Sequence, residues 1–324
     1  MAEESRQVKK KKTILAATRH STQLLLFAIL VLLFLFFGVS SPVFFEVNTL
    51  MALLKQASIY GMIALGMTLV ITSAGIDISV GSTVGLSGIV ASMCMVGSLP
   101  IPVSILVAMG ASVLVGLFNG IIVFDANVPP FIATMGSLII VRNIIMLITG
   151  AATISNLPKS FTGFASGTFM GIPYLFLSYL ALILVTLFLA NKTVFGRNIY
   201  AYGSNKEAAR LSGINVRFVV YGVYIFCAIV CGFAGILLAS RLGNGVPDAG
   251  TGYELDAIAA SVVGGASLDG GESSVIGTVL GAMIMATLRQ GGTLLGVNSF
   301  ILEIIIGSLI VIAVVLDKVR KKRN

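Results

Sequence analysis

Residues 22–39, TQLLLFAILVLLFLFFGV, form an apolar run of 18 residues without a charged side chain. A bilayer core about 30 Å thick is crossed by roughly 20 apolar residues in a helix, so this run predicts a membrane span. Basic residues precede it, as in a signal peptide. The run is longer than the roughly 7–15 apolar residues of such a peptide, however, and no A-x-A-like cleavage site follows. We therefore interpret it as an uncleaved first span.

Nine further apolar runs follow the first one along the chain. They cover residues 51–73, 80–98, 102–124, 130–149, 172–190, 217–240, 254–267, 275–295 and 299–316. The run at 254–267 is too short to cross comfortably alone, and it could be a half-helix, a re-entrant segment or a span lengthened by buried neighbours. The pattern predicts an all-α polytopic membrane protein with about ten transmembrane helices.

The overall composition supports a membrane protein. The chain is 57% hydrophobic and 10% charged, against about 25% charged residues in soluble domains. Three glycine pairs spaced four apart predict close helix packing; they are Gly81 with Gly85, Gly116 with Gly120, and Gly277 with Gly281. The cysteines lie in apolar runs and are expected to be small buried side chains rather than disulfide or metal ligands; they are Cys94, Cys227 and Cys231.

The distribution of positive charge predicts the orientation. The net charge of +8 does not indicate nucleic-acid binding, because Lys and Arg gather at the chain ends and in one central loop. With the N-terminus inside, 16 of the 21 Lys and Arg residues lie in or at the edge of inner segments, as the positive-inside rule requires. We expect a basic cytoplasmic tail at 1–21, a transmembrane domain at 22–316 with a cytoplasmic loop at 191–216, and a basic cytoplasmic tail at 317–324.

An acidic residue interrupts two apolar runs at Gly75-Ile76-Asp77-Ile78-Ser79-Val80-Gly81-Ser82. A charge at mid-bilayer costs about 2.5–3.5 kcal/mol on insertion scales, so Asp77 should face water, protein or an interface. Asp77 or Ser79 could cap the helix that follows. Two interpretations stay open here, an ordered turn at the cytoplasmic surface and a gate or contact with a motor subunit.

The cytoplasmic loop contains a predicted short helix at Gly203-Ser204-Asn205-Lys206-Glu207-Ala208-Ala209-Arg210-Leu211-Ser212-Gly213. Ser204 and Glu207 match a capping box, and Gly213 suits the left-handed stop of a helix. A helix of about eight residues is marginal alone in water, so it should rest against something. Packing on its own membrane domain and docking into a partner remain equally open from this pattern.

A third polar segment opens the short run near residue 254. Glu254 and Asp256 would lie at a helix start, where the helix dipole favours acidic side chains. The glycine-rich stretch at 264–271 follows, but neither it nor any other stretch has the GxxxxGK[ST] pattern of a phosphate-binding loop. If ATP drives transport, the ATPase is therefore another polypeptide, and this chain binds no cofactor itself.

Polar residues inside the apolar runs are candidates for a gate or translocation path. With Asp77 and Ser79 they are Thr68, Thr72, Asn119, Arg142 and Asn143. Arg142 lies near the middle of its run and should face the bundle interior or a water-filled path, for pairing or for substrate contact. Arg289 and Glu303 lie toward the outer ends of consecutive runs, and we predict an ion pair between them.

Several motifs together resemble the permeases of ribose-, galactose- and autoinducer-2-type ABC importers over nearly the whole chain. They are Gly66-Met67-Thr68-Leu69-Val70-Ile71 leading into residues 75–82, Pro130-Phe131-Ile132-Ala133-Thr134, Phe195-Gly196-Arg197, Tyr200-Ala201-Tyr202-Gly203-Ser204-Asn205, Glu207-Ala208-Ala209-Arg210-Leu211-Ser212-Gly213-Ile214, and Thr251 to Ala260 through Gly264-Gly265. The resemblance looks closest to ribose permeases.

The resemblance implies a ten-helix fold of the larger, type II-like importer class in the bacterial inner membrane. It implies a permease dimer, a partner ATPase with two cassettes that binds ATP and Mg²⁺, and an extracytoplasmic sugar-binding protein. It favours docking for the short cytoplasmic helix, as a coupling helix formed by Gly203, Ser204, Asn205, Glu207, Ala208, Ala209, Arg210, Ser212 and Gly213. Ribose is the expected substrate, with galactose, allose, myo-inositol or autoinducer-2 as alternatives.

Two other classes fit the sequence less well. An ion-coupled secondary transporter usually carries titratable groups at mid-membrane, whereas the acidic residues here lie mainly at loops and helix ends. An intramembrane enzyme would need a nucleophile with a base or a His or Cys cluster, and no such pattern is present. We therefore expect a transport subunit that uses alternating access and has no catalytic residue.

Overall fold

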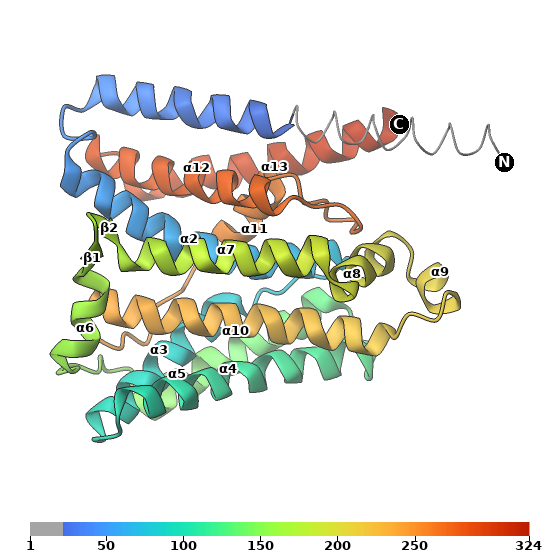
Figure 1. Cartoon of the computed structure of the whole chain (residues 1–324), viewed down its shortest axis with the longest axis horizontal. Helices are drawn as coiled ribbons and strands as arrows, with labels where there is room; N and C mark the ends of the chain where they lie inside the picture. The colour runs from blue at the N-terminus through green and yellow to red at the C-terminus, as the bar shows by residue number, and fades with distance from the viewer. Residues whose placement is uncertain (1–21, 324) are drawn as a thin grey trace.

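The computed structural model describes residues 22–323, which form a helical bundle with one short hairpin (Figure 1). The helices are Thr22–Ser40, α2 (Val47–Thr72), α3 (Val80–Val96), α4 (Ile101–Phe124), α5 (Pro130–Thr149), α6 (Lys159–Ser166), α7 (Tyr174–Lys192), α8 (Val194–Ser204), α9 (Lys206–Leu211), α10 (Val216–Leu242), α11 (Tyr253–Val263), α12 (Val275–Leu294) and α13 (Ser299–Arg323). Strands β1 (Thr168–Phe169) and β2 (Ile172–Pro173) pair antiparallel. The predicted helical, polytopic fold is confirmed.

α2 and α10, the helices with the longest buried stretches, form the centre of the bundle. α2 is buried without interruption from Ala57 to Thr72, and most of α10 beyond Val219 is buried too. A helix that is apolar all round belongs inside a bundle or a membrane. The outer helices show the opposite pattern, because Thr22–Ser40 and α5 expose large apolar side chains such as Leu25 and Leu147. Exposed apolar surface of this extent suits contact with lipid.

The bundle has two distinct ends (Figure 1). α8 and α9 lie at one end, and α6 with the β1–β2 hairpin lies at the other. The helix Thr22–Ser40 begins, and α13 finishes, at the α9 end. Each of the ten predicted runs falls on a helix, and six helices are long and apolar enough to cross a membrane by themselves. The predicted tail at 1–21, with His20, lies outside the described residues.

The eighth predicted run, at 254–267, falls on a short helix that a segment of turns precedes. α11 has 11 residues, which agrees with the prediction that this run is too short to cross comfortably alone. Residues 243–252 precede it and run back into the bundle along α3. Gly245 lies against Ser92 near the end of α3, and Gly250 lies against Gly81 near its start. Gly250 has φ +80°, and a Cβ there would also lie 3.2 Å from the Cβ of Val84, so only glycine fits without strain.

The glycine pairs do permit close helix packing. A Cβ on Gly116 would lie 2.7 Å from the Cβ of Ala228, and one on Gly281 would lie 3.0 Å from the backbone of Ala260. These contacts join α4 to α10 and α12 to α11 at distances that a larger side chain would prevent. The cysteines are all free. Cys227 and Cys231 are buried, as predicted, while Cys94 is only half-buried.

Candidate functional site

The loop between α7 and α10 folds as two helices rather than the single one predicted. α8 occupies residues 194–204, and α9 begins after Asn205, whose side-chain oxygen accepts from the N–H of Ala208 at 2.9 Å. The predicted capping box is wrong, because Ser204 closes α8 and donates its hydroxyl to the carbonyl of Tyr200 at 2.9 Å. α9 therefore has six residues instead of about eight.

The far end of α9 follows the prediction. Gly213 has φ +77°, the left-handed conformation of a helix stop, and its N–H bonds to the carbonyl of Arg210 at 3.0 Å. Glu207, the other residue of the predicted capping box, forms an ion pair with Arg210 at 3.5 Å along the helix surface. Both side chains are largely exposed, so this ion pair adds little stability. The helix is held mainly by its two ends.

α9 projects from the bundle and exposes most of its surface (Figure 1). Ala209 is its buried residue, while Lys206, Glu207 and Arg210 are exposed. Leu211, which follows the charged Arg210 in sequence, is 82% exposed. Sequence reasoning did not include Leu211 among the coupling residues. The signal that could have found it is a single large apolar residue on a short helix whose neighbours are all polar or small.

A cavity of about 500 Å³ lies behind α9. Its walls include the loop after α2, the connection between α4 and α5, and the start of α10. Tyr224 lines it, and the Tyr224 hydroxyl is buried without a hydrogen-bond partner among the described residues. α9 is therefore separated from the bundle over part of its inner side. Of its residues only Ala209 is buried, so packing on the membrane domain, one of the two interpretations left open, explains the burial of Ala209 but not the exposure of the others.

The base of α8 is tightly joined to the end of α2. Gly271, in the loop between α11 and α12, donates its N–H to the carbonyl of Thr72 at 2.8 Å. Gly203 packs against the same place, since a Cβ on it would lie 2.7 Å from the nitrogen of Gly271. The end of α8 is therefore in direct contact with the end of the central helix α2.

Four buried side chains form a polar cluster around the break between α2 and α3. The Asp77 carboxylate accepts from the N–H of Ser79 at 2.9 Å and from its hydroxyl at 2.6 Å. Asn119 donates to the Ser79 hydroxyl at 2.9 Å and accepts from Ser137 on α5. Ser79 stands at the N-cap of α3 without a side-chain cap bond, and the Asp77 carboxylate accepts the N–H of Ser79 itself, just before the helix. Ser137 was not predicted.

Thr68 and Thr72 serve the packing of α2 against α11 and α12. Thr68 bonds to Thr278 at 2.7 Å and to Ser261 at 3.1 Å, and Thr72 bonds to Ser273 at 2.7 Å. Both threonines are fully buried. In this structure they join helices and do not face an opening.

Arg142 and Asn143 point in different directions from the middle of α5. The Arg142 guanidinium enters the bundle and donates to the carbonyls of Pro247 at 2.5 Å and Ala249 at 3.0 Å. Asn143 is exposed and bonds only to the carbonyl of Ile139 in its own helix, at 2.8 Å. A polar amide therefore lies on the otherwise apolar exposed face of α5.

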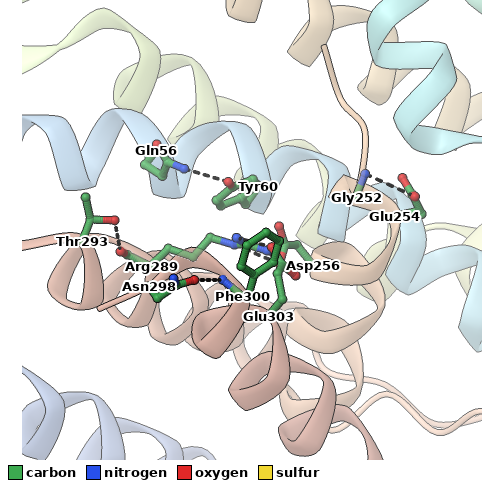
Figure 2. Close-up of polar contacts among 10 residues, drawn as sticks. All are labelled: Gln56, Tyr60, Gly252, Glu254, Asp256, Arg289, Thr293, Asn298, Phe300 and Glu303. Carbon is green, nitrogen blue, oxygen red and sulfur yellow. Dashed lines mark hydrogen bonds and ion pairs between the residues drawn. The ribbon is translucent and has the colours of Figure 1, made fainter. Parts of the chain in front are cut away.

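A charged cluster lies where α11, α12 and α13 meet (Figure 2). Arg289 pairs with Glu303 at 2.9 Å, which confirms the predicted ion pair. Arg289 also pairs with Asp256 at 2.8 Å, and Asp256 is only 1% exposed. Sequence reasoning explained Asp256 by the helix dipole alone and missed this contact. Tyr60 on α2 lies beside the guanidinium, 5.8 Å from ring centroid to the Arg289 carbon.

The described residues contain no cluster of the kind that holds a metal ion. Within 22–323, no three His, Cys, Asp or Glu side chains gather as metal ligands would. The arrangement instead offers an exposed helix connected to a central one, and polar clusters that hold the discontinuous crossings.

Comparison with known proteins adds the family. Residues 49–314 match the family described as branched-chain amino acid transport system / permease component. The ribose import permease protein RbsC of Escherichia coli (strain K12) is 38% identical over 281 residues, covering 86% of this chain and 88% of that protein. The RbsC of Bacillus subtilis (strain 168) is 39% identical over 292 residues, covering 89% and 90%.

Relatives named for other sugars match at a similar level. The galactose/methyl galactoside import permease protein MglC of Escherichia coli (strain K12) is 38% identical over 319 residues, covering 92% of this chain and 95% of that protein. No solved structure matches the chain significantly. The family match covers most of the chain, and the relatives match it over nearly their full length. The chain therefore belongs to the family of transport-system permease components.

Proposed function

We propose that this chain is the permease subunit of an ATP-driven sugar importer and that ribose is its substrate. The family match supports the permease role. Relatives named for ribose, galactose and xylose import or transport support a monosaccharide as the transported molecule. Ribose is the first substrate to test, because relatives with that name come from two distant bacteria.

The observation that carries the ATP-driven mechanism is the exposed helix α9. It projects from the bundle, presents Leu211 at 82% exposure among charged residues, and is joined through α8 to the end of α2. An apolar side chain exposed on a projecting helix gains free energy when a partner buries it, which supports a docking role for α9. The chain lacks a phosphate-binding loop motif, so ATP and Mg²⁺ belong to a partner ATPase with two nucleotide-binding cassettes.

The exposed face of α5 supports a second copy of the permease. Asn143 lies on this face, and a polar side chain held against lipid near mid-membrane is costly. Facing a second copy, or an aqueous path between two copies, removes that cost because the amide then finds hydrogen-bond partners. Alternating access would open this path to each side of the membrane in turn. Few polar groups along it would let a sugar pass without being held.

The charge distribution supports an inner-membrane orientation with the α9 end in the cytoplasm. Sixteen of the 21 Lys and Arg residues lie in or at the edge of segments assigned to the inner side. The opposite end, with α6 and the hairpin, would then receive sugar from an extracytoplasmic sugar-binding protein.

An ion-coupled secondary transporter is the competing class. The buried acidic groups argue against it, since Asp256 is bonded to Arg289 and Asp77 to Ser79. An acid that exchanged a proton or ion in each cycle would have to part from such a partner each time, which costs free energy. The two classes differ in one measurable respect, the requirement for ATP.

Uptake of labelled ribose into proteoliposomes tests the proposal. The vesicles would contain this chain together with a two-cassette ATPase from the same organism, with ATP enclosed. The sugar-binding protein would be added on the outside, the side from which ribose is taken up. We expect ribose uptake that requires ATP hydrolysis and is not collapsed by ionophores. Uptake without ATP, or uptake abolished by an ionophore, would refute the ATP-driven class; preference for galactose or xylose would refute ribose alone.

Leu211→Asp tests the docking role of α9. The change places a charge in the proposed apolar contact, so we expect at least a tenfold weaker ATPase association, about 1.4 kcal/mol, and loss of coupled uptake. Met170→Asp is the matched control, because Met170 is 88% exposed in the hairpin at the opposite end. Equal ATPase binding by Leu211→Asp and wild type would contradict the docking role.

A further inference from the structure

The Arg142 guanidinium is bound by backbone carbonyl oxygens rather than by carboxylates. Nη1 donates to Pro247 at 2.5 Å and to Ala249 at 3.0 Å, and Nη2 donates to Gly81 at 3.3 Å. Three carbonyls from two separate segments thus converge on one positive charge. The arrangement is that of a cation site, with the cation supplied by a side chain.

The carbonyl groups need such a partner because of where they lie. Pro247 and Ala249 belong to segment 243–252, which forms turns rather than a regular helix and runs inside the bundle along α3. Unsatisfied carbonyls at membrane depth cost several kcal/mol each. In transporters with discontinuous helices, unwound carbonyls of this kind commonly coordinate Na⁺ or another cation.

The surrounding charges favour a cation in the same place. Asp248 and Glu254 lie close enough to act on the Arg142 charge. Asp248 lies between the two accepting carbonyls in sequence, and Glu254 lies in the first turn of α11. Gly85 lies against the guanidinium and leaves space for it, because a Cβ at this position would lie 2.9 Å from Nη1 of Arg142.

We propose that the carbonyls of Gly81, Pro247 and Ala249 form a cation-binding site that Arg142 fills permanently, as a tethered cation that holds the re-entrant segment 243–252 to α3 and α5. This goes beyond the proposed permease function and does not depend on the substrate. It explains how the chain stabilises a discontinuous crossing without a mobile ion. Arg142 is then a positioning residue for this segment, and the site accepts a free guanidinium ion once the side chain is removed.

The test measures how readily segment 243–252 opens. Asn244→Cys, introduced after the native cysteines are replaced, reports opening as the rate of maleimide labelling in detergent. Arg142→Gln keeps much of the size but loses the charge, and Arg142→Lys keeps the charge. We expect labelling at least tenfold faster for Arg142→Gln than for wild type, and within threefold of wild type for Arg142→Lys. Equal labelling of the Gln and Lys variants would overturn the proposal.

Chemical rescue separates a cation site from ordinary packing. In Arg142→Ala the space is empty, so guanidinium chloride at a non-denaturing millimolar concentration should slow labelling again in a saturable manner. Urea at the same concentration is neutral and should have no effect, and Arg142→Met, which fills the space, should not respond. Rescue by urea, or equal rescue of the Met variant, would refute the site. If the Ala variant does not fold, the Gln and Lys comparison still decides.

Discussion

Arg289 holds two carboxylates of very different burial, which makes their contributions to stability separable. Asp256 is 1% exposed and lies 2.8 Å from the guanidinium, whereas Glu303 is 57% exposed at 2.9 Å. Truncating one partner of a buried ion pair leaves an uncompensated charge, at about 3–5 kcal/mol, while an exposed pair contributes about 1 kcal/mol or less. The two contacts of one residue therefore differ in energy although their distances are nearly equal.

We predict that Asp256→Ala lowers the free energy of unfolding far more than Glu303→Ala does. The reason is that the Asp256 contact with Arg289 is shielded from solvent, whereas the Glu303 contact, which remains in Asp256→Ala, is largely exposed. Thermal unfolding of the purified protein in detergent measures both changes, and double-mutant cycles with Arg289→Met measure the coupling of each pair. Equal coupling for the two carboxylates would contradict the assignment of Asp256 as the principal partner.

The same cluster shows what single residues reveal in the sequence. Arg289 and Glu303 were predictable as a pair, because both lie toward the same end of two consecutive apolar runs. Asp256 was not, because its local setting at a helix start already explains an acidic residue. Only the packing of α11 against α12 brings Asp256 to Arg289, and that packing depends on glycines such as Gly281 rather than on any charge pattern.

At the scale of elements, α9 depends on its caps. It has six residues, and a helix so short is unstable in water without capping and tertiary support. Asn205 supplies the cap by accepting from Ala208, while Ser204 bonds within α8. Two neighbouring residues with similar capping preferences thus have different roles.

We predict that Asn205→Ala loosens α9 by about 1 kcal/mol, the usual contribution of an N-cap, and that Ser204→Ala has a much smaller effect. Hydrogen exchange of the amides in residues 206–211 measures this, because exchange of a short exposed helix follows its local opening. Faster exchange in the Asn205 variant alone is expected. Faster exchange in the Ser204 variant alone would contradict the cap by Asn205 and support the capping box of Ser204 and Glu207.

The missed cap has a physical reason. Ser, Asn and Asp are all good N-caps, and the sequence contains Ser204 and Asn205 side by side. The choice was decided by α8, whose last turn extends through Ser204. Sequence reasoning predicted only the short helix that follows Ser204 within the basic cytoplasmic loop, so the preceding helix that uses Ser204 was not foreseen. The stop at Gly213 was foreseen, since a left-handed position strongly favours glycine.

At the scale of the whole molecule, the ten apolar runs were predictable because each needs only length and hydropathy. The path of the eighth crossing was not. Residues 243–252, the turns before α11, contain polar and glycine residues that resemble an outer loop in sequence. Two carbonyls of this segment, those of Pro247 and Ala249, accept from Arg142, about a hundred positions away, and such a partner cannot be read from a local pattern.

The orientation of the whole bundle leads to a final prediction. Leu211 in α9 and Met170 in the hairpin are 82% and 88% exposed and lie at opposite ends (Figure 1). In a background without the native cysteines, Met170→Cys should react with a membrane-impermeant maleimide on intact spheroplasts. Leu211→Cys should react only in inside-out vesicles or after permeabilisation, because the positive-inside rule places α9 in the cytoplasm. The reverse labelling pattern would show that the bundle has the opposite orientation in the membrane. Reaction of both cysteines from one side would contradict the placement of the two ends on opposite sides of the membrane.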